Sequence, residues 1–272
     1  MKSTSIKPKT NVRPNGSLNN ETSSKTNVRS NGPLNNETRQ AYAPKIVPNP
    51  EMERICNHYK KLYSGLIFDV LEHMGFANQT LAHEITPLSL DMKLAGPAFT
   101  MKGATTAVKD EKWRYRRLGA IKEMTYPCVE VRDAGTTPFN VALYGELTAT
   151  TARAHGAVGA VVDGGTRDSG MVISMGFPLF ARYRSPVEAF GRVITLDHQV
   201  PILMSGELTE TVVVNPGDFI FGDIDGVIVI PKHLILPVLQ EAERVEGVED
   251  SARAEFKAGG DPVEVFNKYR RL

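Results

Sequence analysis

Short apolar runs alternate along the chain with segments in which apolar residues recur every three or four positions. Apolar runs of strand length lie at 94–101, 128–133, 157–165, 192–196, 211–214 and 219–231. Between the second and third runs, the Ala- and Thr-rich stretch 145–155 is closed by Gly156, which is typical of a helix that ends at a glycine. Strands that alternate with helices in this way predict an α/β fold.

Helices are expected at both ends of this region. Asn49 and Pro50 supply a cap residue and a first-turn proline, so a helix is predicted to begin there. Ser64 begins a second amphipathic helix that stops at Gly75. The C-terminal stretch from Lys232, which carries LILPVLQEAERVEGVEDSARAEFKAG (234–259), predicts two further amphipathic helices.

The N-terminal residues have a different texture and contain a repeat. KTNVRPNGSLNNET at 9–22 returns as KTNVRSNGPLNNET at 25–38, and no aromatic residue precedes Tyr42. Such a composition cannot bury enough apolar surface to order itself. We therefore expect a disordered tail over residues 1–45 and one folded domain over 46–272. The repeat is either a duplicated linker without chemistry or a targeting or docking segment.

The distribution of charge argues against nucleic-acid binding. The net charge is +1, but residues 1–45 hold eight of the 32 Lys and Arg residues against two Glu, so the folded region is slightly acidic. That region shows no basic, aromatic-lined face of the kind that binds nucleic acid. The basic run Arg114 to Arg117 beside Trp113 is most simply a solvated surface segment, and anion binding is the alternative.

The expected compartment and the expected role of the cysteines rest on three signals that the sequence lacks: a membrane helix, a secretory signal and a zinc motif. No apolar run approaches the roughly 18 residues of a membrane helix, and MKSTSIKPKT has no apolar centre of a secretory signal. We expect a cytoplasmic protein with no membrane contact. Cys56 and Cys128 form no zinc motif, so both are expected to be structural thiols.

A pair of charged residues follows the strand expected at 157–165. Arg167 and Asp168 come after Gly164 and Gly165, at the strand end where open α/β sheets place their ligands. The planar guanidinium of Arg167 suits a carboxylate or phosphate, and Asp168 offers a hard oxygen for Mg²⁺ or Mn²⁺. Two other interpretations stay open from spacing alone: a structural ion pair, and a turn in which Asp168 caps the next helix.

A second candidate segment, Gly145-Glu146-Leu147-Thr148, opens the helix expected at 145–155. The backbone amides after Gly145 point out of the helix N-terminus, where partial positive charge collects and a carboxylate can dock. Glu146 is either a partner of the helix dipole or an acid close to a bound ligand. By spacing alone, the Gly145 end and the Arg167-Asp168 end lie at different edges of the sheet unless other elements intervene.

Four segments resemble, in order, the RraA-like family. They are LAGPAFTM (94–101), GELTATTARAHGAVGAVVDGGTRD (145–168), FPLFARYRSP (177–186) and NPGDFIFGDIDGVIVIP (215–231). That family includes the 4-hydroxy-4-methyl-2-oxoglutarate (HMG)/4-carboxy-4-hydroxy-2-oxoadipate aldolases and the regulator of ribonuclease activity A. The resemblance covers about residues 52–270, and the combination of G-E-L with D-G-G-x-R-D is fairly specific.

The resemblance implies an α/β/α-type sandwich with a central β core, assembled as homotrimers or hexamers with sites at subunit interfaces. It also implies that the Gly145 and Arg167-Asp168 turns meet in one cleft. There Arg167 would bind the carboxylate of pyruvate and Asp168 would ligate Mg²⁺ or another divalent cation. The remaining roles fall on the Glu146-Leu147-Thr148 turn, whose amides would bind the same carboxylate, with Glu146 touching the water shell of the metal.

The implied chemistry is a lyase reaction on a small-molecule 2-oxo acid. A divalent metal chelated by the keto and carboxylate oxygens stabilises the pyruvate enolate left when a C–C bond breaks. Retro-aldol cleavage and oxaloacetate decarboxylation share that enolate, so one site can perform both. The alternative is a non-catalytic protein-binding regulator, although the long stretch after Pro231 resembles the aldolases. A methyltransferase is disfavoured because no G-x-G-x-x-G turn opens a helix.

One position departs from the aldolase pattern. The aldolases usually carry an acid three positions after the metal-binding Asp, where this chain has Met171. Metal affinity or proton transfer is therefore expected to differ. The family also uses an acid donated by a neighbouring subunit, for which Glu241 and Glu243 are the candidates here.

Overall fold

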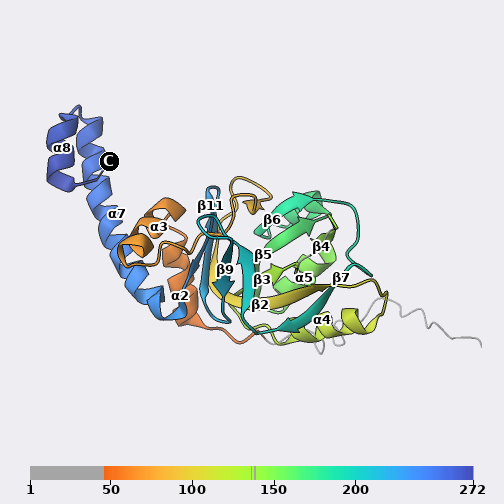
Figure 1. Ribbon diagram of the computed structural model, residues 1–272. Helices are drawn as coiled ribbons and strands as arrows, with labels where there is room; N and C mark the ends of the chain where they lie inside the picture. Colours follow the sequence, from red (N-terminus) through yellow and green to blue (C-terminus); the bar gives the residue numbers. More distant parts are fainter. Residues whose placement is uncertain (1–45, 136, 138, 272) are drawn as a thin grey trace, which may run out of the picture. The chain divides into compact units, whose positions relative to one another are not determined.

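A mixed β-sheet forms the centre of the protein in the computed structural model, which describes residues 46–135, 137 and 139–271 (Figure 1). The sheet strands are β1 (Thr86–Pro87), β2 (Leu94–Thr105), β3 (Cys128–Asp133), β4 (Ala142–Tyr144), β5 (Ala157–Thr166), β6 (Leu179–Arg184), β7 (Val193–His198), β10 (Phe219–Asp223) and β11 (Gly226–Ile230). A separate hairpin consists of β8 (Ile202–Ser205) and β9 (Thr211–Val214). These residues belong to the compact unit Ala43–Leu272, and the tail repeat lies outside the described residues.

Parallel strands occupy the middle of the sheet and antiparallel strands its margins. The order is β1-β6-β5-β3-β2-β10-β11, with β4 on β5 and β7 on β2. The strands β2, β3, β5 and β6 pair in parallel, and β4 is also parallel to β5. The carboxyl ends of these strands therefore open at one edge of the sheet. The predicted α/β fold is confirmed, and the strand runs expected from the sequence all correspond to strands.

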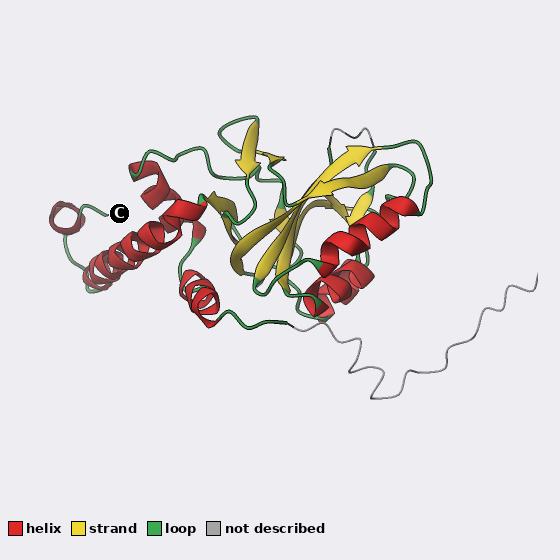
Figure 2. Cartoon of the chain, turned by 90° about the horizontal axis from the view of Figure 1, so that it is seen from below, coloured by secondary structure: helices red, strands yellow, loops and turns green. Residues whose placement is uncertain are grey.

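Two groups of helices lie on opposite sides of the sheet (Figure 2). The first group contains α2 (Pro50–Tyr59), α3 (Ser64–His73), α7 (Ile235–Lys257) and α8 (Pro262–Tyr269). The second contains α4 (Lys112–Lys122), α5 (Glu146–Ala154) and α6 (Ser169–Ser174). Alternation along β10 explains how one strand serves two cores. Phe219 and Phe221 pack with the first group, whereas Ile220 belongs to the other hydrophobic cluster.

The helix ends follow the cap signals in the sequence. Asn49 accepts a hydrogen bond from the Met52 amide at 3.1 Å and so starts α2. Gly75 follows α3 with φ +87°, a left-handed conformation that favours glycine. The buried carboxylate of Asp223, at the end of β10, accepts from the Ser64 amide at 2.9 Å and so supports the start of α3.

The C-terminal helices are confirmed with one difference. The stretch 235–257, expected to divide, is a single 23-residue helix, α7, which continues through Gly247. The second helix, α8, lies beside it, and Lys268 pairs with Glu255 of α7 at 2.8 Å (Figure 1). Over the described residues, none of the helices combines the length and apolarity that crossing a membrane requires.

Candidate active site

The β4-α5-β5 unit brings the two predicted segments together. Tyr144 ends β4 and is in register with Thr166 at the end of the parallel strand β5. The Arg167 amide then donates to the Tyr144 carbonyl at 2.9 Å. The expectation that the two ends lie at different edges was therefore wrong. A helix that runs antiparallel to the next strand has its N-terminus at the edge where that strand ends, so the two segments meet as the resemblance implied.

Gly145 makes close contact with the Arg167-Asp168 turn. A Cβ atom at Gly145 would lie 2.7 Å from Asp168 Oδ2 and 3.2 Å from Arg167 Cγ. The backbone of Gly145 is extended, with φ −152°, so the glycine is required for space rather than for its conformational freedom. The Glu146 amide, the first of α5, donates to Asp168 Oδ2 at 3.3 Å. The Asp168 carboxylate therefore lies at the N-terminus of α5.

Asp168 has a left-handed backbone conformation, with φ 55°. For a residue other than glycine this conformation costs about 1–3 kcal/mol and is concentrated at functional sites. Asp168 occupies the N-cap position of α6, but its side chain makes no capping hydrogen bond and so does not cap that helix. Its carboxylate is turned toward α5 instead.

The ion pair between Arg167 and Asp168 is loose and exposed. Arg167 Nε lies 3.7 Å from Asp168 Oδ2, and the two side chains are 38% and 41% exposed. Exposed pairs of this kind contribute about 0–1 kcal/mol, so a purely structural role explains little. Within the described part of the chain, the terminal nitrogens of Arg167 have no polar partner, and Arg167 lines a cavity of about 310 Å³. They are available to bind an anion.

Of the other residues in the predicted turn, Leu147 and Thr148 line the cavity and Glu146 does not. Leu147 and Thr148 line the same cavity, and the Leu147 side chain is 78% exposed. The Glu146 carboxylate accepts a hydrogen bond from Thr150 Oγ1 at 2.7 Å, one turn along the helix. Met171, three positions after Asp168, is 59% exposed on α6.

Two arginines of the cavity wall were not expected there. Arg117 of α4 and Arg132 of β3 both line the cavity that contains Arg167 and Asp168. The interpretation of the basic run as a solvated surface segment is therefore wrong for Arg117, which is half-buried. Arg132 was overlooked although the sequence carries a signal for it. A charged residue inside the apolar run Cys128–Asp133 has to be paired or to bind something.

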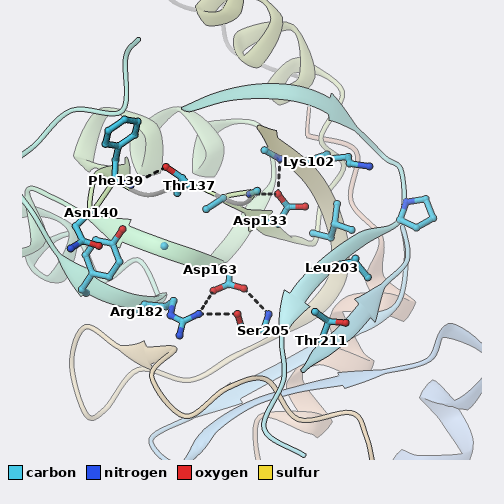
Figure 3. Close-up of a pocket in the computed structure, with 17 residues that line it drawn as sticks. Lys102, Asp133, Thr137, Phe139, Asn140, Asp163, Arg182, Leu203, Ser205 and Thr211 are labelled. Atoms are coloured by element: carbon cyan, nitrogen blue, oxygen red, sulfur yellow. Dashed lines mark hydrogen bonds and ion pairs between the residues drawn. The ribbon is translucent and has the colours of Figure 1, made fainter. Parts of the chain in front are cut away.

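A second cavity, of about 510 Å³, lies among Asp133, Asp163, Arg182 and Ser205 (Figure 3). Its carboxylates bind their own neighbours. Asp163 accepts from Arg182 Nη1 at 3.0 Å and from the Ser205 amide at 2.6 Å. Asp133 Oδ1 accepts from the backbone amides of Gly103 and Gly135, each at 2.8 Å. These groups hold the strand ends together, and neither Arg167 nor Asp168 lines this cavity.

The donor set at the Arg167 cavity fits Mg²⁺ or a similar hard cation. Across the described residues, no cluster of three or more His, Cys, Asp or Glu side chains could enclose a metal. Mg²⁺ does not need such a cluster, because it retains several waters and commonly takes one or two carboxylates plus substrate oxygens. The exposed carboxylate of Asp168 is suited to that form of binding. A dedicated cage for zinc is not compatible with these residues.

The candidate acids of the C-terminal helix have partners within their own chain. Glu241 forms an ion pair with Arg244 at 2.6 Å on α7. Glu243 lies 2.5 Å from His58 Nδ1 of α2. Their donation to a neighbouring subunit stays a prediction.

Comparisons with known proteins agree on one family. The family model described as RraA-like, Aldolase/RraA, matches residues 65–229. A Halalkalibacterium halodurans protein, named provisionally as a 4-hydroxy-4-methyl-2-oxoglutarate aldolase, is 32% identical over 78% of this chain and 91% of its own length. Protein DlpA of Legionella pneumophila is 26% identical over 79% of this chain. The chain spans only 33% of DlpA and 61% of an uncharacterised Methanocaldococcus jannaschii relative.

Solved structures share the fold. An uncharacterised Pseudomonas syringae protein superimposes with a TM-score of 0.69 at 24% identity, covering 82% of this chain and 99% of its own. Streptomyces coelicolor RraAS2, described as an unusual member of the RNase ES inhibitor RraA family, gives a TM-score of 0.63 at 23% identity, covering 76% and 97%. A structure described as novel cellulases from gut-associated microbes gives 0.68 at 30% identity, covering 80% and 96%.

Proposed function

Because this chain belongs to the RraA-like family, we propose that it is a divalent-metal-dependent lyase that cleaves a C–C bond of a 2-oxo acid. The observation that carries the proposal is the junction of Arg167, Asp168 and the α5 N-terminus in one cavity. An aldolase-named relative at 32% identity supports the same reaction class. HMG-type substrates and oxaloacetate are the proposed substrates.

Each group at this junction has a separate task. The free guanidinium nitrogens of Arg167 bind the carboxylate of the 2-oxo acid in a bidentate manner. The first amides of α5 add hydrogen bonds and the positive end of the helix dipole. Asp168 is the residue that would hold the divalent cation, which supplies electron withdrawal from the 2-oxo group when bound. Both charged side chains thereby fix the orientation of the 2-oxo acid beside α5.

To speed the reaction, the site has to stabilise the negative charge that develops at the 2-oxo group. When the C3–C4 bond of the 2-oxo acid breaks, its electron pair passes to C3 and is delocalised onto the 2-oxo oxygen, and the fixed donors of the site stabilise the added negative charge. No lysine is found among the described residues that line this cavity, so a Schiff-base mechanism lacks its nucleophile there. The composition of the lining thus supports the metal-dependent class.

The assembly forms part of the proposal. Leu147 and Met171 are 78% and 59% exposed beside the site. Burial of such residues by a neighbouring subunit would cover them and bring a partner's acid toward Asp168, with Glu241 or Glu243 as the candidates. We propose a homotrimer or hexamer. A monomeric mass by light scattering at working concentration would contradict this part.

The direct test is pyruvate release from oxaloacetate and from HMG, coupled to lactate dehydrogenase, with Mg²⁺ and again with EDTA. Because oxaloacetate also decarboxylates without enzyme, the rate above an enzyme-free blank is the measured quantity. We expect metal-dependent release, lowered about 100-fold or more in Asp168→Asn. The matched control Asp225→Asn, in the exposed turn between β10 and β11, should retain it.

Absence of pyruvate from both substrates would refute the lyase assignment for these acids. It would favour the non-catalytic alternative, a protein-binding regulator like the ribonuclease regulator. Release that is unaffected by EDTA and by Asp168→Asn would instead remove the metal and Asp168 from the reaction.

A further inference from the structure

Arg132 is a buried cation on the wall of the Arg167 cavity. The residue is 4% exposed and sits inside β3. One of its terminal nitrogens donates to Thr195 Oγ1 at 2.9 Å. The other, Nη1, is buried and has no hydrogen-bond partner among the described residues. A buried guanidinium nitrogen without an acceptor is costly, so this atom points to a missing group.

Arg117, on helix α4, also has buried nitrogens that lack hydrogen-bond acceptors among the described residues. Its guanidinium carbon lies 5.9 Å from the centroid of the Tyr144 ring, at the same cavity. Its Nε and Nη2 atoms are buried and also lack partners within the described residues. Burial and then the charge of Arg117 lower the pKa of Arg132 to about 9, against the raising effect of Glu130, as expected for two cations in a poorly solvated space.

Glu130 compensates for only one of these charges. Its Oε2 atom accepts from the Tyr144 hydroxyl at 2.9 Å, and in the described structure its Oε1 atom is buried without a partner. The cluster of Arg117, Arg132, Glu130 and Tyr144 therefore has two positive charges and one negative charge. If Glu130 Oε1 paired with one guanidinium nitrogen, other unpaired nitrogens would remain. Water supplies acceptors but does not neutralise the extra charge.

Among these four residues the excess positive charge is one. Asp133 also acts on Arg132, but its carboxylate already accepts hydrogen bonds from the Gly103 and Gly135 amides. This excess favours a singly charged anion. A carboxylate carries one negative charge and offers two oxygens for the planar donors of arginine. A phosphate monoester brings about 1.5 to 2 negative charges and would overcompensate beside Glu130. A carboxylate is the better match.

We propose that Arg117 and Arg132 form a second anion-binding subsite, which receives the distal carboxylate of a ligand whose first carboxylate binds Arg167. The first-carboxylate part rests on the proposed function. The two subsites share one cavity of about 310 Å³, a volume suited to a small dicarboxylic acid. HMG and oxaloacetate both carry such a distal carboxylate, and simple monocarboxylic 2-oxo acids are expected to bind weakly.

The test compares two probes that differ only in the distal group. 2-Oxoglutarate and 2-oxopentanoate have the same chain length, and only the first carries the second carboxylate. Titration calorimetry with Mg²⁺ measures binding without requiring turnover. We expect the protein to bind 2-oxoglutarate about 10- to 100-fold more tightly, as for a charged hydrogen-bonded contact. Arg117→Gln should remove most of that preference.

Arg116→Gln is the matched control, since Arg116 is exposed on the same helix. It should leave both affinities unchanged. Glu130→Gln should change the affinity for 2-oxoglutarate in the opposite direction to Arg117→Gln. The amide oxygen still accepts from Tyr144, but the competing negative charge is gone, so 2-oxoglutarate should bind more tightly than in the unmodified protein. A merely structural role for the cluster would not produce this gain.

The outcomes separate the two proposals. Equal affinity for the two probes, or no binding of either, overturns the subsite even if pyruvate is released from oxaloacetate. A preference for 2-oxoglutarate that Arg117→Gln abolishes supports the subsite even if no lyase activity is found. A preference that survives in Arg117→Gln and in a folded Arg132→Gln variant assigns the distal carboxylate elsewhere and overturns the proposal.

Discussion

The Oδ2 atom of Asp168 lies 2.7 Å from the point that a Cβ atom on Gly145 would occupy. Two residues from different strand ends thus share one space, and any side chain at Gly145 would displace the carboxylate. Because the Gly145 backbone is extended, another residue could adopt its conformation without strain. The effect of a substitution at Gly145 should therefore fall on the site rather than on the fold.

Gly145→Ala is expected to lower kcat/KM for 2-oxo acid cleavage by about 10- to 100-fold, because the displaced Asp168 carboxylate no longer has the geometry that the site requires. The melting temperature should change by only a few degrees, since the Asp168 side chain is 41% exposed and can move away from the added methyl group. Coupled pyruvate release and thermal unfolding measure the two effects.

Gly170→Ala is the control for the Gly145 variant. A Cβ atom at Gly170 has nothing within 4 Å among the described residues, and the residue lies two positions from Asp168 on α6. Activity should be retained, and stability should stay equal or rise slightly because alanine favours a helix. Equal activity loss in both variants would show that the collision at Gly145 is not the cause.

Arg167→Gln is expected to raise KM and to lower kcat for 2-oxo acid cleavage. A carboxylate clamp acts on the bound substrate and on the charge that develops in the reaction, so both constants should change, with kcat/KM falling about 100-fold. Steady-state kinetics of pyruvate release measure the split. Arg116→Gln, which removes a charge from the exposed side of α4, should leave both constants as they are. Unchanged kinetics in Arg167→Gln would remove the clamp from the mechanism.

The sequence predicted those parts of the fold whose signals are local. The run 128–133 became β3 over the same residues, and the helix at 145–155 became α5 within one residue at each end. The missed elements have weak local signals. The strand β4 is three residues long, and α4 buries only Ala120 and Ile121, so its apolar periodicity is slight.

The site is formed by tertiary contacts that the spacing of residues along the sequence does not reveal. Arg167 and Asp168 were identified from their position after a strand, but their meeting with Gly145 required β4 and its parallel pairing with β5. Arg117 escaped notice because a basic run usually marks a solvated face, and here one of its members turns inward to Tyr144. The cavity is therefore a property of tertiary packing, and of its charged lining residues the sequence placed only Arg167 and Asp168 at the site.

Both cysteines are expected to resist alkylation in the folded protein. Cys56 and Cys128 are 4% and 3% exposed, and burial raises the pKa of each thiol to about 12. The thiolate is the reactive form, so reaction with Ellman's reagent near pH 8 should await unfolding by denaturant. Ser251→Cys, at an exposed position of α7, should react at once and shows that the reagent is active. Prompt reaction of two native thiols would contradict their burial.

Asp133 should make the free energy of unfolding fall as the pH rises. Burial is the main cause that raises the pKa of this carboxyl above 3.8, against the lowering effect of hydrogen bonds from the Gly103 and Gly135 amides. Between 3.8 and its raised pKa, the folded protein holds a proton that the unfolded chain has released, so this contribution to stability is present at low pH and is lost as the pH rises through that window.

Asp133→Asn removes this titration and keeps an oxygen that can accept from both amides. Urea unfolding from about pH 4 to pH 7 should therefore show the variant gaining stability relative to the unmodified protein as the pH increases. The total gain, divided by about 1.4 kcal/mol per pH unit, gives the pKa shift of Asp133. Asp225→Asn, in the exposed β10–β11 turn, should show no such trend. A relative stability of the Asp133 variant that is constant or falls with pH would mean that the hydrogen bonds outweigh the burial of the carboxylate.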